Sequence, residues 1–256
     1  MKNIGLIINL KTFLIAALSV LTTALCLHFD IKGDFPFTIV ATAVIFPIVF
    51  SIGGAYSRRE NALDEYSTMK AHGRAMYFAA RDWVEVSDHA SRDKLKANLN
   101  SLFAETRTLF TAPQADMRKN EEGVYRAFSA LSRYIKTDLR EKGLPSGECS
   151  RCNQYLSKMM VAFENVKHIY QYRTPQTLRA FSDTFIFVLP FVYGPYFAFL
   201  AAESSTGIEY VMPVMFSVVL VALDNIQSHL ENPFDQVGED DIYINAEIFI
   251  ERLDLE

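Results

Sequence analysis

The sequence predicts an all-α membrane protein with four transmembrane helices and a helical body outside the membrane. Three observations lead to this fold class. Four apolar runs are each long enough to cross a hydrocarbon layer of about 30 Å as a helix. A charged segment separates the first two runs from the last two, and no stretch of useful length alternates with the period of a strand. Half of the 256 residues are hydrophobic, as expected for a chain that lies partly in lipid and partly in water.

The second apolar run, within Phe35–Arg59, is the most informative of the four. It carries no charge over roughly 20 residues, so we expect a membrane-spanning helix over 35–56. Thr42, Phe46 and Phe50 recur every fourth residue and therefore lie along one stripe of that helix. Packing against a neighbouring helix is the simplest explanation of such a stripe, and lining a pore is the alternative.

The first apolar run, Ile4 to Leu27, is interrupted only by Asn9 and Lys11. A second span follows at once and the small-residue cleavage pattern of a signal peptide is poor, so the run predicts a retained first transmembrane helix. The loop His28–Asp34 is short, which predicts that the first two spans form an antiparallel hairpin.

The third and fourth apolar runs are Leu178–Ala202 and Ile208–Leu223. Asp183 lies near the start of the third run, four residues after Arg179. This spacing predicts an ion pair within the helix at the membrane surface, and a carboxylate that faces a pore is the alternative.

The charged segment keeps helical spacing and predicts two to four aqueous helices, with breaks near Pro113 and between Gly143 and Gly147. The predicted organisation has four parts: transmembrane helices 1 and 2 in 1–56, an aqueous helical region in 57–177, transmembrane helices 3 and 4 in 178–230, and an acidic tail in 231–256.

Charge is distributed unevenly along the chain. Ser57–Arg179 holds 21 Lys and Arg against 15 Asp and Glu, whereas the residues from Glu231 onward include nine acids and only one base, Arg252. Opposite charge predicts that the tail folds back on the aqueous body of its own or a neighbouring subunit. The basic middle also predicts, by the positive-inside rule, that it and both termini are cytosolic in a multi-pass protein of the cell membrane. The sequence shows no basic patch typical of nucleic-acid binding.

Catalytic and metal-binding motifs are missing from the sequence. We find no HExxH, GxSxG or glycine-rich phosphate loop, and the five histidines are scattered singly, so we do not expect an enzyme. Cys149 and Cys152 form a lone CxxC without a second pair of ligands, which favours a chance spacing in the structure over metal or redox chemistry.

Three short motifs resemble the bestrophin family of ion channels. Ala55–Glu60, AYSRRE, resembles the family's A-Y-x-R-W-W-E at the end of the second span, with Arg59 and Glu60 in place of the tryptophans. Val211–Val214, VMPV, is similar to the V-x-P-V that opens the last span, and Glu231–Phe234, ENPF, is similar to the Asn/Asp-Pro-Phe turn that ends it. The residues that carry the outer two motifs are Tyr56, Arg58, Asn232, Pro233 and Phe234.

The resemblance implies a homopentamer in the lipid bilayer in which the second helix of each subunit lines a central pore. In the family, three positions that lie 16, 12 and 8 residues before the motif arginine form a hydrophobic neck. Counted back from Arg58, these positions are Thr42, Phe46 and Phe50. A second, cytosolic constriction is expected near Leu144.

The resemblance leaves the permeant ion and the cofactor open. Most characterised relatives conduct chloride and other anions, and the basic middle segment favours anions as well; a cation-permeable or non-selective channel is the alternative. Animal members hold calcium with acidic residues after the Pro-Phe turn, which makes Asp240 and Asp241 the candidate calcium ligands here, and no other cofactor is expected. A membrane-anchored interaction or sensing protein is the competing function of another class.

Overall fold

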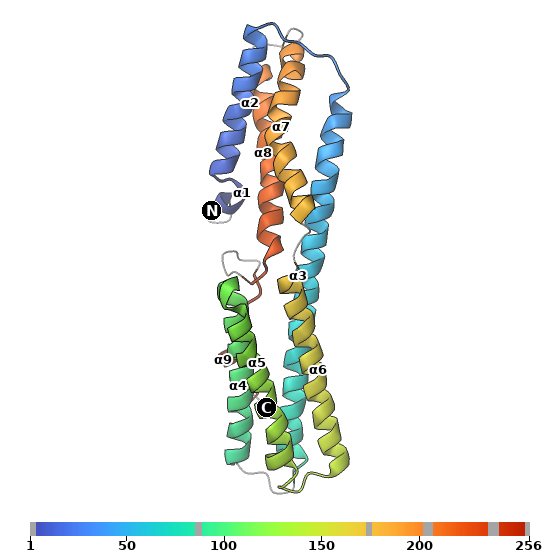
Figure 1. Ribbon diagram of the computed structural model, residues 1–256, viewed down its shortest axis with the longest axis vertical. Helices are drawn as coiled ribbons and strands as arrows, with labels where there is room; N and C mark the ends of the chain where they lie inside the picture. Colours follow the sequence, from blue (N-terminus) through green and yellow to red (C-terminus); the bar gives the residue numbers. More distant parts are fainter. Residues whose placement is uncertain (1–3, 85–88, 173–175, 202–206, 235–240, 254–256) are drawn as a thin grey trace. The chain divides into compact units, whose positions relative to one another are not determined.

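The computed structural model describes residues 4–84, 89–172, 176–201, 207–234 and 241–253, and these ranges contain helices and the connections between them (Figure 1). The helices are α1 Ile4–Ile7, α2 Leu10–His28, α3 Phe37–Asp82, α4 His89–Thr111, a 3₁₀ turn Gln114–Asp116, α5 Met117–Tyr134, a π-helical turn Ile135–Leu139, α6 Ser146–Gln171, α7 Gln176–Leu200, α8 Ile208–Glu231 and α9 Ala246–Glu251.

The described chain divides into two compact units. The first unit comprises the described residues of 1–59 and 172–233, and the second comprises those of 60–171 and 241–253 together with Phe234. Helix α3 contributes its apolar N-terminal part to the first unit and its charged C-terminal part to the second.

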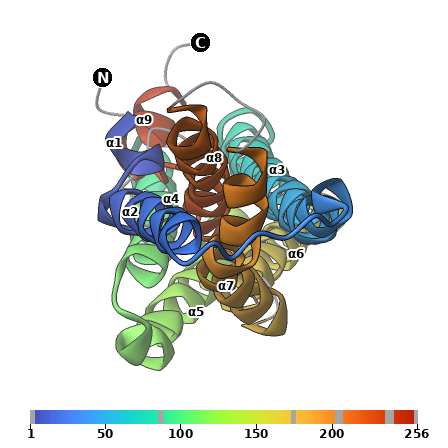
Figure 2. The same cartoon turned by 90° about the horizontal axis from the view of Figure 1, so that it is seen from above.

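The first unit consists of the apolar helices. Within the described residues, α2, α3, α7 and α8 are long and apolar enough to cross a membrane, which confirms the four predicted spans. Helices α2, α7 and α8 lie side by side (Figures 1 and 2). Their shared core with α3 contains Ile15, Val44, Ile48, Ile186, Leu189, Tyr193, Phe197, Leu220 and Val221.

Helix α2 begins six residues later than the sequence predicts. The expected helix from Ile4 is broken at Asn9, whose side chain accepts a hydrogen bond from the backbone N–H of Thr12 while the Thr12 hydroxyl accepts one from the Asn9 backbone N–H. This reciprocal capping box gives the exposed N–H groups of a helix start their partners, and so fixes the start of α2 after Asn9.

Helices α2 and α7 pack closely at Gly194. A Cβ atom at Gly194 would lie 3.3 Å from the backbone carbon of Thr22 and 3.4 Å from the sulfur of Cys26. The Thr22 hydroxyl donates a hydrogen bond of 2.9 Å to the carbonyl oxygen of Pro190. Small residues and helix-to-helix hydrogen bonds of this kind are what hold spans together where lipid offers no hydrophobic driving force.

The second unit consists of the C-terminal part of α3 with α4, α5, α6 and α9. Three long helices lie between residues 89 and 171, as the sequence predicts, with breaks near Pro113 and in the loop before Ser146. Aromatic side chains fill much of the core: Phe110 stacks on Phe234 with ring centroids 4.8 Å apart, and Phe128 and Phe163 are almost fully buried beside them.

The charge pattern predicts that the tail folds back on the aqueous body of its own or a neighbouring subunit. The described part of the tail, 241–253, packs on the second unit of its own subunit. Phe249 in α9 is buried and its ring lies 4.7 Å from that of Phe103. Gly73 leaves room for it, since a Cβ there would meet the Phe249 ring at 3.2 Å. Arg107 on α4 donates two hydrogen bonds of 2.9 Å to the carboxylate of Glu247.

Candidate functional site: the apolar part of α3

The three residues of the predicted neck lie on the exposed face of α3. Phe46 is 59% and Phe50 65% exposed in the single subunit, and Thr42 is exposed as well. The rings of Phe46 and Phe50 contact each other edge to face, with centroids 4.6 Å apart. Two large aromatic side chains that stay uncovered within the subunit are available to something outside it.

The opposite face of the same helix is buried. Ala41, Val44, Ile48, Ser51 and Ala55 are all buried. Val44 and Ile48 belong to the core that α3 shares with α2, α7 and α8. The stripe of Thr42, Phe46 and Phe50 is therefore not the surface by which α3 packs inside its own subunit.

Thr42 differs from the two phenylalanines by its hydroxyl group. That hydroxyl donates a hydrogen bond of 2.7 Å to the carbonyl oxygen of Thr38, one turn earlier. Its donor is thus satisfied by the helix itself, as is common for threonine within spans. The Thr42 end of the stripe remains more polar than the Phe end, because the hydroxyl oxygen can still accept a hydrogen bond.

Pro47 is a feature of this helix that the sequence analysis missed. It lies inside α3, directly after Phe46. Proline has no backbone N–H, so the carbonyl of Ala43 loses its usual helical partner next to the aromatic stripe. A proline between the two phenylalanines, inside an uncharged span, was the available signal.

A charged cluster joins three of the apolar helices. The ammonium group of Lys11 lies 2.8 Å from a carboxylate oxygen of Asp183 and 2.7 Å from one of Asp224, so α2 is linked to both α7 and α8. Asp224 is buried and Asp183 is half exposed. Lys11 was noted in the sequence only as an interruption; a lone lysine in one span and acids in two others was the signal for this cluster.

The predicted ion pair between Arg179 and Asp183 does not form. Arg179 instead donates a hydrogen bond of 3.0 Å to buried Glu231 at the end of α8, while Asp183 binds Lys11. A buried carboxylate gains more from a cation than an exposed one does, because water screens the exposed pair. The partners from other helices therefore displace the local pair.

Three hydroxyl groups form a second polar cluster inside the first unit. The side chains of Ser19, Tyr193 and Ser217 hydrogen-bond one another, and all three are fully buried. They come from α2, α7 and α8, so they link the same three helices as Lys11 and its partners do.

Tyr56 and Arg58 lie about midway along α3, where its apolar part ends, and the other motif residues follow the end of α8. Tyr56 is exposed, whereas Arg58 is half buried and is attracted by the Glu231 carboxylate. Asn232 follows α8, and its buried side-chain oxygen has no hydrogen-bond partner among the described residues. Pro233 is buried as well, and Phe234 lies in the core of the second unit.

Leu144 lies in the connection between the π-helical turn and α6. Its side chain is 3% exposed and belongs to the core of the second unit, and its carbonyl oxygen accepts a hydrogen bond from the Cys149 thiol. This is the position of a core residue in the single subunit, and the cytosolic constriction near Leu144 stays a prediction.

The described residues do not by themselves form a calcium site. Asp240 lies outside the described residues, and Asp241 is the only member of the predicted pair within them. In the part of the chain that the structure describes, no three His, Cys, Asp or Glu side chains are grouped as metal ligands would be. Calcium binding by Asp240 and Asp241 therefore stays a prediction.

The two cysteines of the CxxC are both buried and carry free thiols. Burial, with smaller contributions from the neighbouring Cys149 and Glu148, raises the pKa of the Cys152 thiol to about 12. A thiol with so high a pKa is almost entirely protonated at neutral pH and is a poor nucleophile and metal ligand.

The sequence matches no model of a protein family and no curated protein. Several solved structures match the fold. A bacterial Bestrophin homologue from Klebsiella pneumoniae that carries a point mutation matches with a TM-score of 0.75 at 18% identity, over 95% of this chain and 97% of that chain. Another structure of a bacterial Bestrophin homologue from the same organism matches with a TM-score of 0.73 at 19% identity, over 95% and 96%. A structure described as a membrane protein matches with a TM-score of 0.76 at 18% identity, over 95% and 97%. The chain therefore has the fold that the motif resemblance implies.

Proposed function

We propose that this chain is one subunit of a bestrophin-like homopentameric ion channel whose hydrophobic neck is formed by Thr42, Phe46 and Phe50 of α3. The observation that carries the proposal is that α3 has two different faces. One face packs against the other apolar helices through residues other than these three, and the two phenylalanines on the other face remain exposed in the single subunit. The likeness in fold to the bacterial Bestrophin homologues supports it.

An uncovered aromatic stripe on a span can face either lipid or other copies of the same helix. Five copies about an axis bring five pairs of Phe46 and Phe50 rings together around a narrow conduit. Such rings offer no hydrogen bonds to a hydrated ion, so the conduit loses its water when narrow and conducts when it widens. Thr42 adds a ring of hydroxyl oxygens, which makes that end of the neck easier to wet.

Pro47 gives α3 a point at which the neck can change its width. Because the Ala43 carbonyl lacks its helical hydrogen bond there, the helix bends at lower cost than a regular helix does. A small bend at Pro47 moves Phe46 relative to Phe50, which is the kind of displacement that opens a hydrophobic constriction.

Anions are the permeant ions that we propose. The aqueous segment between Ser57 and Arg179 carries six more basic than acidic side chains, and a positive surface raises the local concentration of chloride. The sign of the reversal potential in a salt gradient tests this preference, because anion-selective and cation-selective channels give reversal potentials of opposite sign.

Conduction is tested with the purified full-length protein in planar bilayers under asymmetric KCl. We expect discrete currents whose reversal potential lies toward the equilibrium potential of chloride. We expect the double substitution Phe46→Ala and Phe50→Ala to increase the open conductance or the open time several-fold, since smaller side chains leave the neck wetted.

The matched control is another exposed pair with the same spacing. Phe187 and Phe191 on α7 are 58% and 51% exposed, and their ring centroids lie 5.9 Å apart. Replacing both by alanine removes the same aromatic area from a different span and is expected to leave the current unchanged. If only the α7 variant changes the current, or if no variant conducts, the proposed neck is wrong.

The number of subunits is measured separately by native mass spectrometry of the detergent-solubilised protein. We expect a complex of five copies of the 29.1 kDa chain. A stable monomer or dimer that never conducts favours the competing function, a membrane-anchored interaction or sensing protein.

A further inference from the structure

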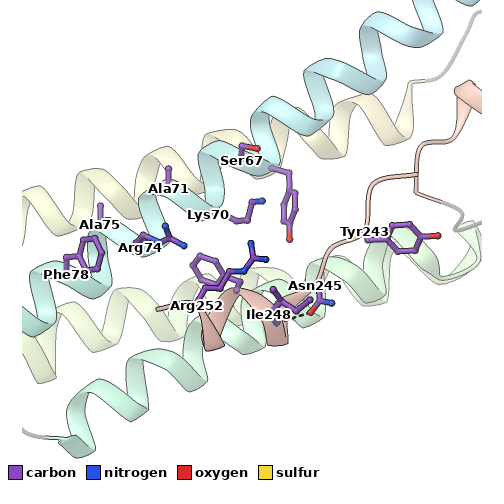
Figure 3. A pocket seen from close by; sticks show the side chains of 12 residues that line it. Ser67, Lys70, Ala71, Arg74, Ala75, Phe78, Tyr243, Asn245, Ile248 and Arg252 are labelled. Atoms are coloured by element: carbon purple, nitrogen blue, oxygen red, sulfur yellow. Dashed lines mark hydrogen bonds between the residues drawn. The ribbon is translucent and has the colours of Figure 1, made fainter. Parts of the chain in front are cut away.

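A basic pocket in the second unit has the composition of an anion-binding site. It has a volume of about 530 Å³ and lies between the C-terminal part of α3 and the segment from Tyr243 to Arg252 (Figure 3). Its charged lining residues are Lys70, Arg74 and Arg252, and no acidic side chain lines it. Lys70 and Arg74 extend from α3 and Arg252 follows α9, and their side chains face the space between these segments (Figure 3).

The three cations have no acidic partner in the part of the chain that the structure describes. The arginines elsewhere in the same unit show the contrast: Arg107 is held by Glu247, and Arg81 by Asp82. Lys70 is half buried, and its ammonium group lies 4.5 Å from the ring centroid of buried Tyr66. A cation over an aromatic face is stabilised, but its charge is not neutralised.

Electrostatic repulsion among the three cations contributes to a lowered pKa of Lys70, which lies on α3 beyond its apolar span. Burial lowers the pKa of Lys70, and the positive charges of Arg252 and Arg74 lower it further. An anion between the three side chains is attracted by each of them and also offsets the repulsion of the cations for one another. Both effects favour its binding.

The shape of the lining favours an anion with an organic group attached. Two guanidinium groups offer flat pairs of N–H donors that match the oxygens of a phosphate, and the lysine adds a further donor. The pocket is much larger than a bare phosphate, and Tyr66, Phe78, Ile248 and Phe249 give it an apolar and aromatic wall. Pockets of about 300 to 1,000 Å³ with such walls and a few placed charges are typical of small-molecule sites.

We propose that this pocket binds a phosphate monoester, with the phosphate held by Lys70, Arg74 and Arg252 and the organic group against the aromatic wall. The site lies entirely within the second unit and needs no residue of the neck. It can therefore be correct even if the chain does not conduct, and the channel can be correct even if the site is wrong.

The test is isothermal titration of the full-length protein in detergent with phenyl phosphate and, separately, with inorganic phosphate. We expect one phenyl phosphate per chain, bound at least about tenfold more tightly than inorganic phosphate because the ring contacts the apolar wall. We expect the double substitution Arg74→Gln and Arg252→Gln to weaken phenyl phosphate binding at least about tenfold, since two charge-assisted contacts are lost.

The matched control removes two arginines from another face of the same unit. Arg126 and Arg133 on α5 are exposed and do not line the pocket, so replacing both by glutamine is expected to change the affinity less than about twofold. An equal loss in the control overturns the proposal. It is also overturned if phenyl phosphate binds, but no more tightly than inorganic phosphate. All variants are first compared by gel filtration with the wild-type protein.

Two further arms identify the source of the phosphate group. Binding of nanodiscs that contain phosphatidic acid, compared with phosphatidylcholine alone, detects a lipid headgroup, while phenyl phosphate detects a soluble ester. Binding in either arm that is lost in the Arg74→Gln and Arg252→Gln protein supports the site, and no binding in both overturns it. A chain that lacks residues 254–256 is expected to bind equally well; binding more than about tenfold tighter overturns the proposal, because the chain's own acidic end is then the occupant.

Discussion

At the scale of single residues, the surroundings of a side chain decide what the same residue type does. Phe46 and Phe249 are both phenylalanines on helices, but Phe46 is uncovered in the subunit and Phe249 is buried against Phe103. Lys11 and Lys70 are both partly buried lysines, but Lys11 is held between two carboxylates and Lys70 faces two arginines. We therefore assign Phe46 to the proposed neck and Lys11 to the ion pairs that link the apolar helices. Phe249 belongs to the core of the second unit, and Lys70 to the proposed anion site.

The thiol of Cys152 is expected to be unreactive in the folded protein. Because its pKa is raised to about 12 and its side chain is fully buried, a water-soluble maleimide at pH 7.5 should label it at least about a hundredfold more slowly than an exposed cysteine. Labelling is measured over time by peptide mass spectrometry, before and after unfolding in detergent and urea.

Ser150 provides the control for this measurement. It is exposed on the same helix, two residues before Cys152, so Ser150→Cys is expected to react quickly in the folded state. Rapid labelling of Cys152 without unfolding contradicts the burial of this side chain.

At the scale of the helix, partners from neighbouring elements determine how each helix is placed. Helix α3 buries Val44 and Ile48 and leaves Phe46 and Phe50 uncovered, although all four are apolar. Helices α5 and α6 are linked by Lys167, whose ammonium group lies 2.8 Å from Glu121 on α5 and binds Glu164 one turn earlier on α6. The exposed phenylalanines of α3 lead to the proposed neck. The ion pairs of Lys167 lead to a pH-dependent contribution to the stability of the second unit.

Lys167 is expected to stabilise the second unit at neutral pH but not in acid. Its hydrogen bond lowers the pKa of Glu121 below the ordinary value of 4.5. A carboxylate with a depressed pKa in the folded state stabilises the protein above its unfolded pKa and loses this effect as pH falls through its folded pKa. We expect Lys167→Met to cost about 1–2 kcal/mol of unfolding free energy at pH 7, because the group is only partly shielded from water.

The check is thermal unfolding of the full-length protein in detergent at pH 7, 5 and 3.5, followed by circular dichroism. The difference between wild type and Lys167→Met should persist at pH 5 and shrink at pH 3.5. Lys158 is exposed on the same helix, and Lys158→Met is expected to have little effect at any of these pH values. A difference that stays constant down to pH 3.5 would show that packing, not the ion pair, is lost.

At the scale of the whole molecule, the C-terminal segment of the chain packs on the second unit and completes its core. Phe249 and the Arg107–Glu247 pair attach α9 to α3 and α4, and the same attachment forms one side of the basic pocket. The stability of this segment therefore determines whether the pocket exists.

Truncation of Phe249 is expected to loosen the segment strongly. Phe249→Ala removes a ring that is 4% exposed, and large-to-small changes of this kind cost about 3–5 kcal/mol. We expect a lower unfolding temperature in detergent and faster hydrogen exchange over 242–253. Ile248→Ala, on the exposed side of the same helix, is the matched control and should change both values little; equal effects of the two variants contradict the docking of α9 described here.

Much of this architecture could be predicted from the sequence because its causes are local or periodic. The spans follow from uncharged apolar runs, and the helices of the aqueous unit from apolar spacing and the breaks at Pro113 and before Ser146. The exact start of α2 was not predicted, since the capping role of Asn9 was not recognised in an apolar run. The stripe of Thr42, Phe46 and Phe50 was visible as a pattern, but its exposure was not.

The sequence by itself determined the four spans, the aqueous helices and the return of the acidic tail, because hydrophobicity, helical period and net charge are properties of the chain alone. Only the tertiary structure decided that Lys11 pairs with Asp183 and Asp224, that Arg179 turns to Glu231, and that Lys70, Arg74 and Arg252 meet in one pocket. These contacts join residues far apart in the chain, and their partners are chosen by distance and burial after the helices have packed.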